Sequence, residues 1–458
     1  MRYLSTRAQT TERVSFKDAV MMGLAEDGGL LLPESVPSVA DRLDKLAGLS
    51  YKELAFEIIS LFTDDIPASD LKNLIEKSYS TFETSEVAPV VKKDGVYIQE
   101  LFHGPTFAFK DVALQLLGNL FEYILRERNE QLNIIGATSG DTGSAAIYGV
   151  RGKENINIFI LHPKGRVSPV QEMQMTSVTD ANVHNLAIKG TFDDAQDIVK
   201  AAFGDIAFKK KYKLGAVNSI NWARVLAQIV YYFYGYFQAQ KQGAKKVRFV
   251  VPTGNFGNIF AGYFAKQMGL PLDKIVLATN ENNILSRFIK SGDYSTREVV
   301  QTYSPSMDIQ IASNFERYLY FLYGKDSAVL RSKMDELKKT GKIVFSDAEM
   351  AKVQAEFATF STSNELTEKT IASFYKNTEY VLDPHTACGV AAAIEMADAD
   401  YVCLSTAHPA KFPDVVEKAT GKAPEKPAGI ARLETLDKKC SEIDNDLQKV
   451  KDFVAQNV

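Results

Sequence analysis

The spacing of apolar residues changes once along the chain and separates an N-terminal part from a longer remainder. In the first part, apolar residues recur at helical spacing. Two polar pairs, Ser15 with Asp18 and Ser50 with Glu53, precede such segments and have the form of helix N-caps. We therefore expect a small, mainly helical domain over residues 1–92.

In the longer remainder, short apolar runs rich in β-branched residues alternate with segments of helix length. The runs lie at residues 132–137, 155–161, 247–252, 274–279, 342–346 and 400–406. Apolar runs of this kind, separated by helices, are typical of a parallel sheet that is buried on both faces. The fold class is therefore α/β, with mostly parallel open sheets over residues 93–420 and a smaller lobe at about 130–225.

The C-terminal residues 421–458 form a third part. Prolines and glycines at 421–432 predict a strap between elements. Apolar residues then follow at alternating spacings of four and three: Leu436, Cys440, Ile443, Leu447, Val450 and Val454. This stripe is compatible with a coiled coil, but because it is short we favour a single amphipathic helix that packs on the body of the protein.

Composition and charge narrow the class of protein. The chain has 458 residues, 45% of them hydrophobic and 24% charged, which is typical of a globular protein with more than one core. A formal net charge of −4 argues against a nucleic-acid partner. The cysteines, Cys388, Cys403 and Cys440, lack CxxC spacing, so we expect a reducing compartment and no metal site.

The sequence also predicts the location of the protein. Its first residues lack the apolar core of a signal peptide. The most apolar helical segment, residues 225–237, is too short to cross a bilayer. We therefore expect a cytoplasmic protein without a membrane partner, and the oligomeric state stays open between monomer and homodimer.

The stretch 101–116, LFHGPTFAFKDVALQL, contains the first candidate for chemistry. Lys110 follows a His-Gly-Pro turn and three phenylalanines, and it stands directly before a helical pattern. A lysine in such surroundings is costly to desolvate and titrates easily, which suits amine catalysis and Schiff-base formation. The alternative is a lysine whose stem packs on the phenylalanines while its ammonium reaches water. We interpret Asp111 as a helix-start residue, favoured there by the helix dipole, rather than as a second catalyst.

Two glycine-rich loops follow predicted strands and precede predicted helices. They are GATSGDTGSAA at 136–146 and VPTGNFGNIFA at 251–261. In an open parallel sheet, ligands bind at the carboxyl ends of strands, where glycines and helix N-termini direct amides at an anion. We expect a phosphate site in the second loop, although either segment is also compatible with a structural turn.

Two further segments carry polar groups next to predicted elements. Ser405 and Thr406 are the last residues of the apolar run at 400–406. Their hydroxyls could contact a ligand, but the two residues could also simply mark the end of the strand. Arg224 follows a polar run that starts at Asn218, which suits an oxyanion or phosphate grip but also a solvated helix start. Motifs for dinucleotides, P-loops, zinc proteases and nucleophile elbows are absent from the sequence.

A buried amine, a separate phosphate loop and a distal hydroxyl are the parts that a pyridoxal phosphate enzyme needs. The segments HGPTFAFKD, GATSGDTGSAA, VPTGNFGN and LSTAHPAKF closely resemble the threonine synthase family, in its longer bacterial and fungal form. The N-terminal STR and GLAEDGGLLLPE resemble the opening of that family, so the likeness spans nearly the whole chain. The resemblance implies pyridoxal 5'-phosphate as cofactor and a fold similar to the tryptophan synthase beta chain.

The resemblance also implies roles for individual residues. Lys110 matches the lysine that binds the cofactor as a Schiff base, and Thr406 matches the hydroxyl that faces the pyridine nitrogen. The residues implied at the cofactor phosphate are Gly254, Asn255, Phe256 and Gly257. The residues implied at the substrate phosphate are Ser139, Thr142, Asn218, Ser219 and Arg224. Asp141 is implied in cofactor binding, but it stands where many relatives have asparagine, which leaves open the group that hydrogen-bonds the ring oxygen.

The implied reaction converts O-phospho-L-homoserine and water into L-threonine and phosphate, the last step of threonine biosynthesis. Lys110 would move protons between substrate carbons. Two anion sites would be needed, one for the phosphate of the cofactor and one for the phosphate of the substrate. The alternatives are another lyase of the same fold, such as a serine or threonine dehydratase, which has no second phosphate to hold, and a catalytically silent relative that binds phosphometabolites.

Overall fold

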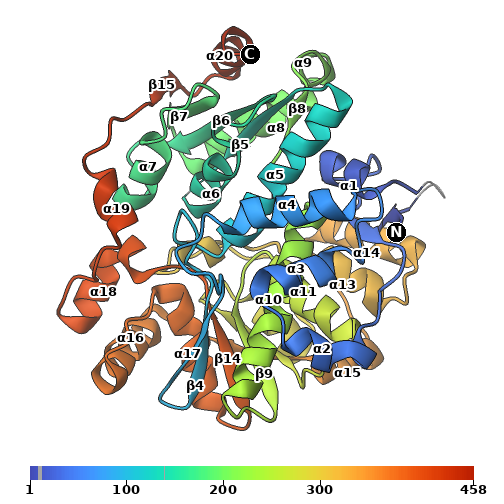
Figure 1. Ribbon diagram of the computed structural model, residues 1–458, viewed down its shortest axis with the longest axis vertical. Helices are drawn as coiled ribbons and strands as arrows, with labels where there is room; N and C mark the ends of the chain where they lie inside the picture. The colour runs from blue at the N-terminus through green and yellow to red at the C-terminus, as the bar shows by residue number, and fades with distance from the viewer. Residues whose placement is uncertain (9–12, 139) are drawn as a thin grey trace.

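Two open β-sheets organise the protein, and helices cover their faces (Figure 1). The computed structural model describes residues 1–8, 13–138 and 140–458. Within these residues the larger sheet has six strands in the order β13-β10-β9-β14-β4-β3, and only β3 runs antiparallel to its neighbour. The strands are β3 (Val90–Lys93), β4 (Val96–Glu100), β9 (Val247–Pro252), β10 (Ile275–Thr279), β13 (Phe357–Ser361) and β14 (Asp400–Ser405).

The smaller sheet is entirely parallel. In the part of the chain that the structure describes, it has five strands in the order β15-β7-β6-β5-β8. The strands are β5 (Leu132–Ala137), β6 (Ile156–Pro163), β7 (Val183–Lys189), β8 (Leu214–Gly215) and β15 (Ser441–Asp444). Figure 1 shows this sheet in the upper half of the molecule and the larger sheet in the lower half. The predicted α/β class with mostly parallel sheets is therefore confirmed.

Most of the apolar runs form strands because they are buried on both faces. Every residue of β9 and β10 is buried, which is why these strands lack an alternating pattern. The run at 342–346 is an exception to the prediction. Only Lys342–Ile343 is a strand (β12), and it pairs antiparallel with β11 (Tyr294–Ser295) outside both parallel sheets. In the two sheets, β3, β4, β7, β8 and β13 were not predicted either.

Helices connect the strands of both sheets. The helices that position the site are α5 (Lys110–Arg128), α6 (Asp141–Val150), α10 (Trp222–Lys241) and α11 (Gly257–Gln267). The others are α7 (Pro169–Thr176), α8 (Phe192–Gly204), α9 (Ile206–Lys211), α12 (Ile284–Ser291), α13 (Phe315–Leu322), α14 (Ser327–Thr340), α15 (Asp347–Glu356), α16 (Asn364–Thr378), α17 (Pro384–Met396), α18 (Pro413–Thr420), and the 3₁₀ helices η2 (Pro305–Met307) and η3 (Pro409–Lys411). Across the described residues, no helix is both long and apolar enough to cross a membrane.

The N-terminal region is mainly helical, as the sequence predicts. Its helices are α1 (Phe16–Met22), η1 (Ala40–Arg42), α2 (Leu43–Ala47), α3 (Tyr51–Ile59) and α4 (Ala68–Tyr79). Both predicted N-caps are confirmed, because Ser15 accepts from the amide of Asp18 and Ser50 forms a capping box with Glu53. A two-stranded antiparallel sheet of β1 (Tyr3–Ser5) and β2 (Leu31–Pro33) was not predicted.

The C-terminal segment differs from its prediction. After a short helix, α19 (Ala428–Leu433), the chain forms β15 on the edge of the smaller sheet, and the final helix α20 begins only at Leu447 and ends at Gln456. The predicted helix over 436–446 is therefore wrong, and the coiled-coil alternative fails with it, but the expected amphipathic helix packed on the body exists in α20, where Val450 and Val454 are buried. Edge strand β7 supplies backbone partners for β15. Ile443 and Leu447 nevertheless pack against the same apolar cluster, which explains the misleading spacing.

Candidate active site

Lys110 is the first residue of α5, and the loop before it lies against the end of β14. The amide of Phe109 donates to the carbonyl of Thr406 at 2.8 Å, and the amide of His408 donates to the carbonyl of Phe107 at 3.0 Å. These backbone bonds form a short antiparallel bridge between two segments that are far apart in the sequence. They bring together Lys110 and Thr406, the residues predicted for the two ends of the cofactor ring.

The side chain of Lys110 is mostly buried, with 13% of its surface exposed. Burial lowers the pKa of its amine to about 8, and the positive charges of Lys411 and Arg224 act in the same direction, while Asp141 opposes them. The amine therefore loses its proton about one pH unit above neutrality, at a much lower pH than an exposed lysine. This burial contradicts the alternative of an ammonium that extends into bulk water.

Asp111 fixes the loop in front of Lys110. Its carboxylate accepts hydrogen bonds from the amide of Thr106 at 2.8 Å and from the Thr106 hydroxyl at 2.7 Å. Burial raises the pKa of Asp111 to about 6. A Cβ on Gly104 would lie 2.4 Å from the Cβ of Asp111, so only glycine fits at this turn. These contacts agree with the helix-start role that the sequence indicates.

Asp141 begins α6 and lies between two lysines. Its Oδ1 is 2.6 Å from the Nζ of Lys411, and its Oδ2 is 3.8 Å from the Nζ of Lys110. Burial alone would raise the pKa of this carboxyl, but the two lysines hold it well below its usual range. Asp141 is therefore ionised and next to the reactive amine.

Lys411 is a residue of this site that sequence reasoning missed. It belongs to η3, its side chain is fully buried, and its Nζ donates to the carbonyl of Thr106 at 2.8 Å. The segment LSTAHPAKF drew attention to Thr406, but nothing in its spacing distinguishes Lys411 from a surface lysine. Only the fold places this charge beside Asp141.

The loop at residues 254–257 connects β9 to α11. Phe256 has a left-handed backbone, with φ of 63°, and it turns the chain into the helix. Phe256 is also the N-cap residue of α11, and its side chain makes no hydrogen bond to the first-turn amides of this helix. Unpaired amides and the helix dipole together favour an anion at this position. The loop therefore has the geometry of a phosphate site.

Arg224 lies in the first turn of α10 and is 5% exposed. Its Nε and Nη1 are buried and have no hydrogen-bond partner among the described residues. Burial lowers the pKa of the guanidinium to about 10. Asn218 likewise has a buried, unpartnered Oδ1. Because buried unpaired polar groups are costly, the guanidinium nitrogens of Arg224 indicate a site for an anionic ligand, whereas the Asn218 oxygen needs a hydrogen-bond donor.

The remaining predicted residues lie around the same centre or outside the description. Thr142 is the second residue of α6 and is partly buried. Ser219 hydrogen-bonds Ser313 at 3.0 Å, and the Ser313 hydroxyl donates to the Oδ1 of Asn255 at 3.2 Å. This chain of hydroxyls places Ser219 beside the loop at 254–257. Ser139 lies outside the described residues.

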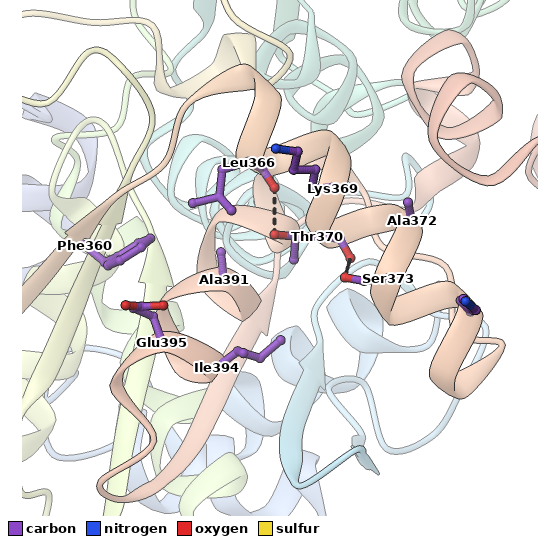
Figure 2. Close-up of a pocket in the computed structure, with 10 residues that line it drawn as sticks. Phe360, Leu366, Lys369, Thr370, Ala372, Ser373, Ala391, Ile394 and Glu395 are labelled. Carbon is purple, nitrogen blue, oxygen red and sulfur yellow. Dashed lines mark hydrogen bonds between the residues drawn. The ribbon is translucent and has the colours of Figure 1, made fainter.

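A surface groove lies apart from these residues. Figure 2 shows it between α16 and α17, with Leu366 and Thr370 on one side and Ile394 on the other. Its lining includes none of the residues gathered around Lys110. The groove is therefore separate from the candidate active site.

Comparison with known families covers nearly the whole chain. Residues 2–79 match the family model described as "Threonine synthase N terminus". Residues 82–403 match "Pyridoxal-phosphate dependent enzyme", and residues 386–454 match "Threonine synthase, C-terminal". The middle match alone spans more than half of the chain.

Individual relatives agree with the family models. The threonine synthase of Saccharomyces cerevisiae is 47% identical, over 100% of this chain and 98% of that protein. The threonine synthase of Pseudomonas aeruginosa is also 47% identical, with the same coverage. The crystal structure of pyridoxal-phosphate-bound threonine synthase from Brucella melitensis superposes with a TM-score of 0.96 at 46% identity, covering 100% of this chain and 99% of that one. The chain therefore belongs to the threonine synthase family, and it is a pyridoxal-phosphate-dependent lyase.

Proposed function

We propose that the protein converts O-phospho-L-homoserine and water into L-threonine and phosphate. The observation that carries the proposal is Arg224, a buried guanidinium with two unpartnered nitrogens close to a buried amine. A lyase that holds only the cofactor phosphate has no need of this second cationic site. The relatives named threonine synthase, which align with this chain over its full length, support the same reaction.

The residues present fit pyridoxal phosphate. Lys110 supplies an amine whose pKa of about 8 leaves a fraction of it neutral near physiological pH, and the uncapped amides of α11 suit a phosphate. We assign Gly254, Asn255, Phe256 and Gly257 to this phosphate and Thr406 to the pyridine nitrogen. When bound, the cofactor withdraws electrons and so stabilises negative charge on substrate carbons.

Lys110 is the residue that we assign to proton transfer. Its Nζ takes a proton from one substrate carbon and delivers it to another, and a pKa of about 8 makes both directions accessible near neutral pH. Arg224 and Asn218 orient the substrate phosphate as it leaves from Cγ, before water adds at Cβ. The surrounding groups are buried, which limits the access of further water.

We assign the start of α6 to the substrate as well. Thr142 is the second residue of this helix, Asp141 lies 3.8 Å from Lys110, and Ser139 is assigned with them from the sequence alone. Ser219 is bonded through Ser313 to Asn255, so we place its hydroxyl between the two proposed phosphates.

A spectroscopic and product assay tests the function. The purified protein with pyridoxal phosphate should show the visible absorption of a lysine-bound cofactor, and Lys110→Ala should abolish it. With O-phospho-L-homoserine, wild-type protein should release threonine and phosphate in equal amounts. A protein that never gains the visible band would overturn the cofactor assignment to Lys110. Ammonia and a 2-oxo acid from threonine, without phosphate release from phosphohomoserine, would indicate a dehydratase instead.

We also propose the organisation and location of the protein. The three parts are residues 1–92, 93–420 and 421–458, with a smaller lobe at about 130–225 that carries the start of α6. The free thiols of the cysteines support a cytoplasmic location, which cell fractionation can test.

A further inference from the structure

A second buried lysine, Lys411, contacts Asp141, the carboxylate that also lies near Lys110. Lys411 has no exposed side-chain surface, and its Nζ has two acceptors, the Asp141 carboxylate at 2.6 Å and the carbonyl of Thr106 at 2.8 Å. Lys110 approaches the same carboxylate only to 3.8 Å, which is longer than a hydrogen bond. One carboxylate is thus shared unequally by two ammonium groups.

We propose that Lys411 is a positioning residue, which binds Asp141 so that Lys110 makes no hydrogen bond to this carboxylate and remains a reactive amine. The proposal rests on the role assigned to Lys110 in the proposed function. It concerns the charge balance around Lys110 and gives Lys411 no contact with substrate.

The two oxygens of Asp141 have different surroundings. Oδ1 accepts from Lys411 and also from the Nε2 of Gln171 at 2.7 Å. Oδ2 faces Lys110 and the hydroxyl of Ser306, which is 3.4 Å away. Lys411 and Gln171 therefore fix the carboxylate through the oxygen that points away from Lys110.

Backbone contacts also fix the position of Lys411. η3 follows β14, and the amide of His408 at its start donates to the carbonyl of Phe107 in the Lys110 loop. Thr106 lies in that loop and accepts from Lys411. The same loop therefore sets the positions of both lysines relative to Asp141.

The charged groups around Lys110 come from four elements. They are Asp111 on α5, Asp141 on α6, Arg224 on α10 and Lys411 on η3. Burial and the two cations lower the pKa of Lys110 to about 8, and the two carboxylates oppose this shift. Without Lys411, Lys110 would be the one cation left within 4.0 Å of the Asp141 carboxylate, among the residues that the structure describes. A carboxylate next to an ammonium stabilises the protonated form, which cannot attack an aldehyde.

Titration of Lys110 in the cofactor-free full chain tests the proposal. The protein is reductively methylated with ¹³C-formaldehyde and cyanoborohydride as hydride donor, and the Lys110 signal is identified by its absence in Lys110→Arg. Lys411→Met should raise the midpoint of this signal by about 1–2 pH units, which is the usual effect of a nearby opposite charge. Lys411→Met with Asp141→Asn removes both charges and should return the midpoint to within about half a pH unit of wild type.

Two further variants separate this role from a structural one. Lys153 is a matched control, because burial also lowers its pKa and it pairs with Glu122 away from the site. Lys153→Met should leave the Lys110 midpoint unchanged. Lys411→Arg keeps the charge and should keep the midpoint near wild type even if stability falls.

The outcomes are distinct from those of the proposed function. An unchanged Lys110 midpoint in folded Lys411→Met would overturn the proposal, and so would a double variant whose midpoint differs from wild type as much as that of Lys411→Met. If Lys411→Met does not fold, the double variant and Lys411→Arg decide by the same midpoints. A wild-type protein that binds no pyridoxal phosphate would refute the function and leave this titration result unaffected.

Discussion

The starts of helices α6 and α11 have the same topology but different chemistry. Each follows a parallel strand, β5 or β9, through a glycine-rich loop. Each therefore begins at the carboxyl end of a strand, where ligands bind in open parallel sheets. At α6 the first residue is Asp141, and the hydroxyl of Thr138 accepts from the amide of Gly143 at 3.0 Å. At α11 the loop is uncharged.

This difference shows how one architecture serves two purposes. The first residue of α6 carries a carboxylate of the protein itself, which faces two lysines. The N-terminus of α11 has amides to offer to an anion from outside. We therefore expect changes at α11 to alter cofactor affinity and changes around α6 to alter the titration of Lys110.

The largest expected effect comes from giving α11 the charge that α6 carries. Asn255→Asp should raise the dissociation constant of pyridoxal phosphate on the order of 100-fold, because a carboxylate near the cofactor phosphate costs several kcal/mol at short range. Spectral titration of cofactor-free protein measures this constant. Asn255→Ala is the uncharged control and should have a much smaller effect. Unchanged affinity in Asn255→Asp would remove this loop from the phosphate site.

A third helix start, that of α10, should serve the substrate rather than the cofactor. Arg224→Ala should raise KM for O-phospho-L-homoserine roughly 10- to 100-fold, because charge-assisted hydrogen bonds contribute about 1.5–3 kcal/mol each. The affinity for pyridoxal phosphate should stay the same. Arg224→Lys keeps the charge without the planar fork and should give an intermediate KM. An unchanged KM in Arg224→Ala would refute the proposed contact between Arg224 and the substrate phosphate.

The pH dependence of cofactor binding should reflect the titration of Lys110 and not the loop at residues 254–257. The neutral amine of Lys110 reacts with the aldehyde, so the rate should rise with pH through about 8 and level off above it. At pH 7 the rate should be about one tenth of the plateau, since each pH unit below the pKa lowers the neutral fraction about tenfold. Stopped-flow absorbance measures this rate. Asn255→Ala should change the rate but not the midpoint, and a midpoint near 10.5 in wild type would contradict the effect of burial.

The smallest effect concerns the packing of the two loops. A Cβ on Gly143 would lie 2.4 Å from the Cγ2 of Thr138, whereas one on Gly257 would lie 3.1 Å from the Nδ2 of Asn314. Gly143→Ala should therefore lower the free energy of unfolding by about 1–3 kcal/mol, as overpacking does, and Gly257→Ala by less. Denaturant unfolding monitored by circular dichroism compares the two. Equal losses would show that the loops are equally tolerant.

Much of the fold and part of the candidate site follow from local sequence. Apolar runs that are buried on both faces predict β5, β6, β9, β10 and β14, and the caps at Ser15 and Ser50 depend on neighbouring residues alone. Lys110 stands out because phenylalanines precede it and a helix follows. These features are readable because strand burial and capping depend on side-chain patterns within a few residues.

Tertiary structure alone decided the rest. The pairing of β15 with β7 overrides a helical spacing, because an open strand edge supplies backbone partners that no local pattern records. Lys411 follows β14 of the larger sheet, whereas Asp141 follows β5 of the smaller sheet, so their contact joins two different sheets. Local sequence determined where an amine and two anion-binding loops could form. The order of the strands decided which charges surround that amine, because electrostatic contacts depend on distance in space and not along the chain.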